Sequence, residues 1–288
     1  NITVIDDLSI GKRNNIKNKK IIFVNRDILD INKIKFKKKF HSVVHLAAKA
    51  EILIPKKKED IYYESNISGL QSVLNFTANR GIEKFIFASS ASVYGDTKNK
   101  KVSENFELSP QHFYAYTKYI GEKMVRSYCS TNNINFTILR FFNIYGSNSN
   151  AVVAKFIAQK IQNKKITIYG NGKQKRDFVH VDDLSGAIHK IINSKSQNNI
   201  FNIGAGKAES ILDLKNIISH KRDHIFLEKR NDDIEISISN INKIKKRLFW
   251  KPKISFKNGV KEIEKLDKMR LLRFNLPSVK QQQKLIKK

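Results

Sequence analysis

A tyrosine and a lysine four residues apart carry the clearest chemical signal in this sequence. Tyr114 and Lys118 stand in the run FYAYTKYIGEK, which belongs to a helix pattern over residues 113–131. At this spacing both side chains lie on one face of a helix. A nearby ammonium favours the phenolate and lowers the pKa of tyrosine, so the pair could act as a general base toward a sugar or alcohol hydroxyl. Taken alone, the spacing is also common in helices whose tyrosine and lysine are merely solvated.

A serine cluster strengthens the catalytic interpretation. The run ASSASVYGD follows the apolar strand pattern at residues 84–88, about 24 residues before Tyr114. Ser90 at this strand end could hydrogen-bond the same hydroxyl that Tyr114 would deprotonate. A turn or a helix cap is the simpler role for a lone serine, and Ser89 fits that role. The serine cluster, the helix and a following LRFFNIYG strand are together more specific than any one of them.

The elements that would position these residues alternate between short strands and longer helices. Helix patterns cover residues 60–80 and 113–131. The strand patterns are at residues 2–5, 21–24, 42–46, 84–88 and 135–139. This alternation predicts an α/β fold with a parallel sheet covered by helices on both faces. Ligands bind at the carboxyl ends of such strands, where this sequence places small and polar residues.

Composition sets limits on the class of protein. The 288 residues fit one large α/β unit or two intertwined domains. A single cysteine, Cys129, excludes an intrachain disulfide and favours a reducing, cytoplasmic location. No apolar run approaches the roughly 18 residues of a membrane span, so we expect no membrane partner.

The formal net charge of +29 raises the question of a polyanionic partner. The lysines are scattered along the whole chain, in runs such as KNKK, KFKKKF and KIKKR, without one dominant stripe. This distribution favours a compositional bias toward Lys, Asn and Ile over a nucleic-acid site. A modest steering of anionic nucleotide substrates is compatible with the charge.

A series of ordered motifs adds a family resemblance that covers roughly residues 1 to 265. The chain resembles the extended short-chain dehydrogenases/reductases of the NAD-dependent nucleotide-sugar epimerase/dehydratase family, and is especially similar to UDP-glucose 4-epimerase-like enzymes. The resemblance implies NAD as cofactor, a nucleotide sugar such as a UDP-sugar as substrate, and a homodimer. The motifs are VIDDLSIGKR, RDI, HLAA, NISG, SSASVYGD, YAYTK, LRFFNIYG, TIYGNGKQKRDFVHVDD, FNIGAG, KRNDD and WKP.

The implied fold is a Rossmann-like doubly wound parallel sheet with a smaller, intertwined C-terminal substrate domain. We expect an NAD-binding domain at residues 1–148 with 178–204, and a substrate-binding domain at 149–177 with 205–267. Residues 268–288 are expected to form a basic tail.

The position of Asp6 near the start of the sequence leads to a further expectation about the sheet. The dinucleotide fingerprint places its acid about 20 residues after the glycine loop, yet the matching acid here is Asp6. The sheet is therefore expected to lack its first strand and glycine loop. Such a sheet should have a gap between neighbouring strands with unpaired edges. We expect the 288-residue chain to bind NAD weakly and to aggregate.

The resemblance implies a set of NAD-binding residues, most of them just after predicted strands. Asp6 matches the acid that binds the adenosine ribose hydroxyls. Other matched positions lie beside the adenine, near the pyrophosphate and ribose, and beside the nicotinamide. The implied NAD-binding residues are Asp6, Asp27, Ile28, Leu46, Ala47, Ala48, Ser65, Asn66, Lys118 and Phe142.

Catalytic and substrate-binding roles carry over in the same way. Ser90 matches the catalytic hydroxyl, Tyr114 the base and Lys118 the contact to the nicotinamide ribose. Arg176 and Arg230 match residues that hold the diphosphate, a role that suits the bidentate fork of arginine. No metal is expected. The implied substrate-binding residues are Ser90, Asn143, Thr167, Tyr169, Arg176, Arg230, Asp233 and Ser237.

The residues after the catalytic serine bear on the reaction. Dehydratases of the family resemble a Thr-Asp-Glu run there, whereas this chain has Ser90, Ala91 and Ser92, with no carboxylate to move protons at sugar carbons. This favours epimerisation at C4 through a 4-keto sugar. The small Ser237 suggests room for an N-acetyl group. The alternatives are a dehydratase or reductase of the same family, or a catalytically inactive relative that binds nucleic acid.

Overall fold

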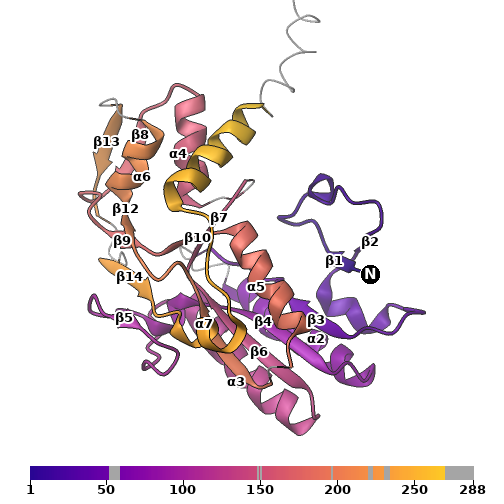
Figure 1. Ribbon diagram of the computed structural model, residues 1–288. Helices are drawn as coiled ribbons and strands as arrows, with labels where there is room; N and C mark the ends of the chain where they lie inside the picture. The colour runs from indigo at the N-terminus through magenta and orange to yellow at the C-terminus, as the bar shows by residue number, and fades with distance from the viewer. Residues whose placement is uncertain are drawn as a thin grey trace, which may run out of the picture. The chain divides into compact units, whose positions relative to one another are not determined.

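The computed structural model describes two compact units (Figure 1). The first unit comprises Asn1–Asp96, Glu104–Phe141 and Ile191–Asn202, and the second comprises Thr97–Ser103, Phe142–Lys190 and the chain from Ile203 onward. This division assigns residues 97–103, 142–148, 178–190 and 203–204 to the second unit, whereas the expected NAD-binding domain included them. The cofactor and substrate roles of the two halves stay predictions. The described residues are 1–51, 59–147, 149, 151–195, 197–219, 223–229 and 234–269.

A four-stranded sheet forms the centre of the first unit, in the order β11-β6-β4-β3. The pairs β3–β4 and β4–β6 are parallel, as predicted. Strand β4 is buried along almost its whole length, as expected of a parallel strand covered on both faces. The strand bounds are β3 Ser42–His45, β4 Lys84–Ser90, β6 Asn135–Phe141 and β11 Asn199–Ile203.

The predicted gap in this sheet is confirmed. Strands β1 (Thr3–Asp6) and β2 (Ile22–Asn25) form a separate parallel pair. Among the described residues, β1 pairs only with β2, and β3 pairs only with β4. Each of the two therefore keeps an unpaired edge, which is where a further strand would complete a continuous sheet.

Helices and apolar side chains build the core of the first unit. The predicted helix at 60–80 is one helical region with a π-helical stretch in its middle, a deviation that is frequent at functional sites. The core contains Leu70, Phe85, Phe87, Val125 and Ile138. The helical segments are η1 Arg13–Asn15, η2 Ile28–Lys33, α1 Glu59–Tyr63, the π-helical stretch Glu64–Ser68, α2 Gly69–Asn79, η5 Ala91–Tyr94 and α3 Phe113–Thr131.

The second unit combines three small sheets with helices around its own apolar core. Its strands are β5 Lys101–Val102, β7 Asn143–Tyr145, β8 Ile166–Tyr169, β9 Lys175–Arg176, β10 Phe178–His180, β12 Glu209–Ser210, β13 His224–Leu227 and β14 Ile236–Ser239. They pair as β10-β7, β13-β8 and β12-β9-β14-β5. The helices are α4 Val152–Ile161, α5 Val181–Asn193 (its last residues fall in the first unit), α6 Ile211–Ile218, α7 Asn242–Leu248 and a helix at 256–269.

The C-terminal helix and the apolar character of the helices bear on two further expectations. Lys268 and Met269 of the expected basic tail close the helix at 256–269, and the rest of that tail lies outside the described residues. None of the helices that the structure describes has the length and apolar character needed to cross a bilayer.

A glycine lets α3 approach the sheet closely. A Cβ atom at Gly121 would lie 2.7 Å from Phe87 Cζ and 3.2 Å from Leu70 Cδ2. We expect Gly121→Ala to lower the free energy of unfolding by about 1–3 kcal/mol, because overpacking outweighs the helix propensity of alanine. Urea denaturation measures the effect.

Gly186 in α5 is the matched control for this substitution. No atom lies within 4 Å of a Cβ placed there, and the residue is exposed. Gly186→Ala should therefore stabilise the protein by about 0.5–1 kcal/mol. Changes of the same sign for the two variants would contradict the close-packing explanation.

Candidate active site

The three predicted catalytic residues come together in the first unit. Ser90 is the last residue of β4, and Tyr114 and Lys118 lie on α3. Ser90 lies close enough to the Tyr114 hydroxyl for its side chain to lower the pKa of the phenol. Ser92 donates to Ser90 Oγ from its backbone N at 3.2 Å and from its Oγ at 3.0 Å. The strand end and the first turns of the helix thus hold two hydroxyls in contact.

His112, which the sequence reasoning missed, helps to orient Tyr114. Its Nδ1 accepts a hydrogen bond from Ala115 N at 3.3 Å and so caps α3. Its ring stacks on the Tyr114 ring with centroids 6.1 Å apart and planes inclined by 9°. An N-cap immediately before the helix pattern is the sequence signal that could have identified it.

The net pKa of Tyr114 is raised in this arrangement, whereas its spacing from Lys118 predicted a lower value. Burial raises the pKa of Tyr114, and the hydrogen bond with Ser90 only partly opposes this. The Lys118 ammonium donates to Ala88 O at 2.8 Å and lies 5.9 Å from the centroid of the Tyr114 ring. Burial therefore outweighs the neighbouring charge in setting the pKa of the phenol.

Lys118 itself lies in a buried, largely apolar setting. Burial lowers the pKa of Lys118 to about 8, so the ammonium still carries its charge at neutral pH. The nitrogen is 5.1 Å from the centroid of the Phe87 ring. Burial, together with the charge of Lys118, lowers the pKa of His45 to about 3, so this histidine is neutral. The site therefore keeps its positive charge on Lys118.

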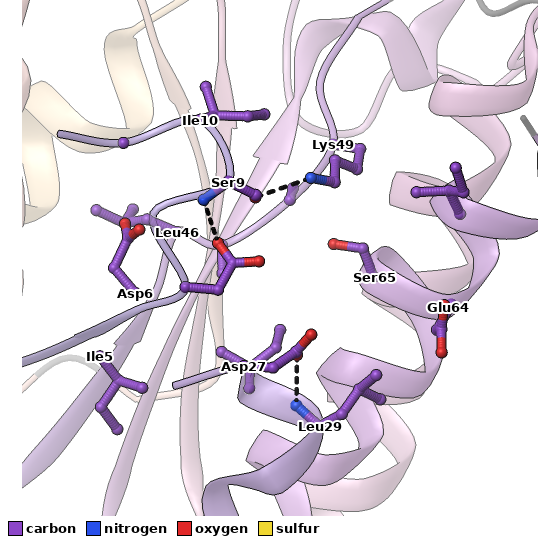
Figure 2. Close-up of a pocket in the computed structure, with 16 residues that line it drawn as sticks. Ile5, Asp6, Ser9, Ile10, Asp27, Leu29, Leu46, Lys49, Glu64 and Ser65 are labelled. Carbon is purple, nitrogen blue, oxygen red and sulfur yellow. Dashed lines mark hydrogen bonds between the residues drawn. The ribbon is translucent and has the colours of Figure 1, made fainter. Parts of the chain in front are cut away.

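A pocket of about 400 Å³ lies in the first unit, at the ends of β1, β2 and β3 (Figure 2). Its volume falls in the range of small-molecule sites. Asp6, Asp27, Ile28, Leu46, Ala47, Ala48 and Ser65, all predicted NAD-binding residues, lie around it. The other lining residues are Ile5, Asp7, Ser9, Ile10, Gly11, Leu29, Lys49, Ile61 and Glu64.

The donors and acceptors in this pocket fit a dinucleotide. Leu8 N donates to Asp6 Oδ1 at 2.7 Å, which holds a carboxylate that can accept from ribose hydroxyls. A Cβ at Gly11 would lie 3.0 Å from both Asp6 carboxylate oxygens, so a larger residue would crowd this carboxylate. Lys49, absent from the sequence prediction, supplies a cation suited to a diphosphate, and its Nζ donates to Ser9 Oγ at 2.9 Å (Figure 2).

Other predicted NAD-binding residues stand apart from this pocket. Asn66 is buried, accepts from Lys49 N at 2.8 Å, and donates to Lys49 O and Thr117 Oγ1, both at 3.0 Å. It therefore holds the backbone of the pocket wall against α3. Phe142 belongs to the second unit, where its N donates to Ile203 O at 2.9 Å.

The predicted substrate-binding residues that the structure describes belong to the second unit, except Ser90. Arg176 of β9 and Ser237 of β14 are paired in register, so the structure brings these two together. Thr167 and Tyr169 lie on β8 in a different sheet, and the Thr167 hydroxyl accepts from Gln159 Nε2 at 3.0 Å. Arg230 and Asp233 lie outside the described residues.

A buried carboxylate organises the strands around Arg176. Asp177 accepts from Ala205 N at 2.5 Å, Gly206 N at 3.0 Å, Ser239 N at 2.9 Å and Ser239 Oγ at 2.5 Å. Its carbonyl accepts from Asn143 N at 3.0 Å. Burial raises the pKa of Asp177, and these donors oppose the rise. The carboxyl thus ties the neighbours of Arg176, Asn143 and Ser237 into one backbone framework.

The family model for the NAD dependent epimerase/dehydratase family matches residues 1–204. That range contains the pocket and all three residues of the Ser90–Tyr114–Lys118 centre. The chain belongs to the NAD-dependent epimerase/dehydratase family. It is an extended short-chain dehydrogenase/reductase with NAD as its cofactor, and the predicted α/β Rossmann-like fold is confirmed.

Several relatives of this epimerase/dehydratase chain match over most of its length. A putative UDP-glucose 4-epimerase of Methanocaldococcus jannaschii is 34% identical and covers 91% of this chain and 88% of its own. The structure of Thermotoga maritima UDP-glucose 4-epimerase with UDP-glucose superposes with a TM-score of 0.88 at 29% identity, covering 93% of this chain and 91% of that chain. UDP-N-acetylglucosamine 4-epimerase of Methanobrevibacter ruminantium, in complex with UDP-N-acetylmuramic acid, gives 0.84 at 29% identity, covering 93% and 90%.

The last feature of the site concerns metal-binding side chains. Within the part of the chain that the structure describes, no group of three or more His, Cys, Asp or Glu side chains could hold a metal ion.

Proposed function

We propose that this family member epimerises a UDP-sugar at C4 by transient oxidation to the 4-keto sugar. The proximity of Ser90, at the end of β4, to Tyr114, with Lys118 one turn further along α3, carries the proposal. The sequence Ser90-Ala91-Ser92 supports epimerisation over dehydration, because elimination of water needs a carboxylic acid that this segment does not contain.

Each catalytic side chain has a defined task in this proposal. Tyr114 takes the proton from the C4 hydroxyl as C4 is oxidised and returns it when C4 is reduced from the opposite face. Ser90 donates a hydrogen bond to the same oxygen and holds it at the phenol. When bound, NAD supplies the hydride acceptor and donor, and its cationic nicotinamide favours the phenolate that burial disfavours.

Residues of the second unit are proposed to hold the nucleotide while the 4-keto sugar rotates. Arg176 and Arg230 bind the diphosphate, and Asn143, Thr167, Tyr169, Asp233 and Ser237 contribute the remaining contacts. The nucleotide stays bound and only the sugar rotates, so the hydride can return to the opposite face of C4. The register pairing of Arg176 with Ser237 supports a shared site for diphosphate and sugar.

An activity panel tests this proposal. The protein is incubated with UDP-glucose, UDP-N-acetylglucosamine and UDP-glucuronate, and products are identified by NMR. We expect interconversion of C4 epimers without net NADH formation. Accumulation of a 4-keto-6-deoxy sugar would identify a dehydratase, and absence of any conversion across the panel would contradict the proposal.

The size of the residue at position 237 is proposed to select the sugar. Ser237 is small and is the register partner of Arg176, which supports the proposal that it leaves room for an N-acetyl group. Ser237→Tyr should lower kcat/KM for UDP-N-acetylglucosamine at least about 10-fold more than for UDP-glucose, because steric exclusion acts on the larger substrate. Steady-state kinetics with both substrates measure this, and an equal loss for both would contradict the assignment.

We also infer a homodimer formed through α1 and α3. Three large side chains are half exposed on these neighbouring helices: Tyr63 at 56%, Tyr116 at 50% and Ile120 at 42%. Tyr116 and Ile120 are four residues apart and share one face of α3. An exposed apolar face of this kind is typical of a protein interface.

Sedimentation equilibrium tests the dimer. Wild-type protein should sediment as a dimer, and Tyr116→Glu/Ile120→Glu should sediment as a folded monomer, because two buried charges would oppose association. Phe249, 86% exposed on the second unit, provides the matched control, and Phe249→Glu should remain dimeric. A monomeric wild type at micromolar concentration would overturn the inference.

A further inference from the structure

A buried ion pair lies directly behind the catalytic serine and the helix that carries the base. Arg140 of β6 binds Glu122 of α3 through two hydrogen bonds, Nη2 to Oε2 at 2.7 Å and Nε to Oε1 at 2.9 Å. Both side chains are only 3% exposed. Ser89 Oγ donates to the same Glu122 Oε1 at 2.6 Å. The carboxylate is thus fixed by three donors from two strands.

The positions of these residues along their elements connect them to the catalytic centre. Arg140 is the register partner of Ser89 in the β4–β6 pair, so it stands one residue from Ser90 along the sheet. Glu122 follows Lys118 by four residues on α3 and lies on the same helix face. The ion pair therefore links the strand end bearing Ser90 to the helix face bearing Tyr114 and Lys118.

The network continues beneath the turn that follows Ser90. Arg140 Nη1 donates to Tyr94 Oη at 3.0 Å and to Glu104 O at 2.9 Å. Tyr94 Oη donates in turn to Asn202 Oδ1 at 2.6 Å. Tyr94 is the last residue of η5, the turn that begins directly after Ser90. Both ends of the serine-bearing segment are therefore tied to Arg140.

Burying two charges costs desolvation free energy, so this ion pair is an expensive way to stabilise the fold alone. Burial disfavours the guanidinium charge, but hydrogen bonds and attraction from Glu122 raise the pKa of Arg140 above its usual value, so the residue stays charged. Well-packed apolar residues often replace a buried ion pair without loss of stability. Directional contacts, which apolar residues cannot make, are what the pair adds at this place.

We propose that Glu122 and Arg140 are positioning residues that hold Ser90 within hydrogen-bond reach of Tyr114. This inference rests on the proposed function of Ser90 and Tyr114. Neither residue exchanges a proton with the sugar. The ion pair fixes the position of the end of β4 relative to α3. Loss of the pair is therefore expected to move the Ser90 and Tyr114 hydroxyls apart.

The test removes both charges together, because a single substitution leaves an unpaired buried charge that by itself destabilises the fold. Glu122→Leu/Arg140→Met should retain a melting temperature near that of the wild type. We expect kcat to fall about 10-fold or more, with KM for the UDP-sugar changed less than about twofold, because misplaced catalytic groups affect the chemical step. Hydrogen exchange should accelerate at the amides of residues 90–95.

A second ion pair in the chain is the matched control. Lys160 and Glu264 lie 2.7 Å apart in the second unit. Lys160→Met/Glu264→Leu removes a less buried charge pair, with side chains 31% and 11% exposed, and should leave kcat and the exchange of residues 90–95 unchanged. Arg140→Lys adds a further readout, because it keeps the charge but loses the two-pronged contact, and kcat should stay low.

Ser89→Ala keeps the inference testable if the double variant does not fold. This change removes the hydroxyl contact to Glu122 and leaves the ion pair in place, so exchange at residues 90–92 should rise and kcat should fall. A folded double variant with kcat within twofold of wild type and unchanged exchange would overturn the proposal. If wild-type protein converts no nucleotide sugar, the proposed function fails, and the exchange measurement still decides whether the pair positions the segment.

Discussion

Tyr114→Phe is expected to reduce epimerase turnover by about 10²- to 10⁴-fold, the usual range for loss of a general acid–base group. The substitution removes the hydroxyl that lies beside Ser90 and keeps the ring that stacks on His112. The free energy of unfolding should therefore fall by only about 1 kcal/mol, the contribution of one hydrogen bond. Steady-state kinetics and urea denaturation of the same preparation separate the two effects.

Tyr116→Phe is the matched control on the same helix. Tyr116 is 50% exposed and two residues away from Tyr114, so it lies on another face of α3. Its hydroxyl has no task in the proposed reaction, and the variant should keep wild-type turnover. Equal turnover of the two variants, whether both active or both inactive, would contradict the assignment of Tyr114 as the base.

Gly95→Ala is expected to have the largest effect on the fold of the active site. Gly95 adopts φ 65° and ψ −143°, a conformation essentially confined to glycine. A Cβ there would lie 2.0 Å from the carbonyl oxygen of Ser109, which is a backbone atom that cannot rotate away. Since Ser109 N also bonds Val93 O at 3.0 Å, the whole turn after Ser90 would have to move.

We expect this substitution to destabilise the protein by about 4 kcal/mol or more, through backbone strain and steric overlap together. Thermal unfolding, followed by circular dichroism, measures the loss. The control is Gly81→Ala, at φ 59° with no atom within 4 Å of the added Cβ, which should cost only about 1 kcal/mol. A similar cost for both variants would show that the contact with Ser109 carries no weight.

Local sequence patterns were sufficient for the elements that carry the catalytic residues. The helix pattern at 113–131 coincides with α3, and the strand pattern at 84–88 lies within β4. Periodicity of apolar residues is a property of the chain itself, so it can be read without knowledge of distant segments. The same holds for the spacing of Tyr114 and Lys118, which the helix converts into a shared face.

The predicted helix at 60–80 shows where local reading loses detail. The pattern predicts one regular helix, whereas the structure has a π-helical stretch, Glu64–Ser68, between α1 and α2. This stretch presents Ser65 to the pocket and directs Asn66 into hydrogen bonds with Lys49 and Thr117. Those partners are 17 and 51 residues away in the chain, so periodicity carries no information about them.

By itself the sequence determined the family, the α/β class, the gap in the central sheet and the candidate residues Ser90, Tyr114 and Lys118. Only the tertiary structure decided the environment of those residues. Burial, which depends on how distant strands and helices pack, raises the pKa of Tyr114, whereas spacing alone predicted a decrease. The contact of Glu122 with Arg140 likewise depends on packing, because a helix and a strand must meet before the two charges can pair.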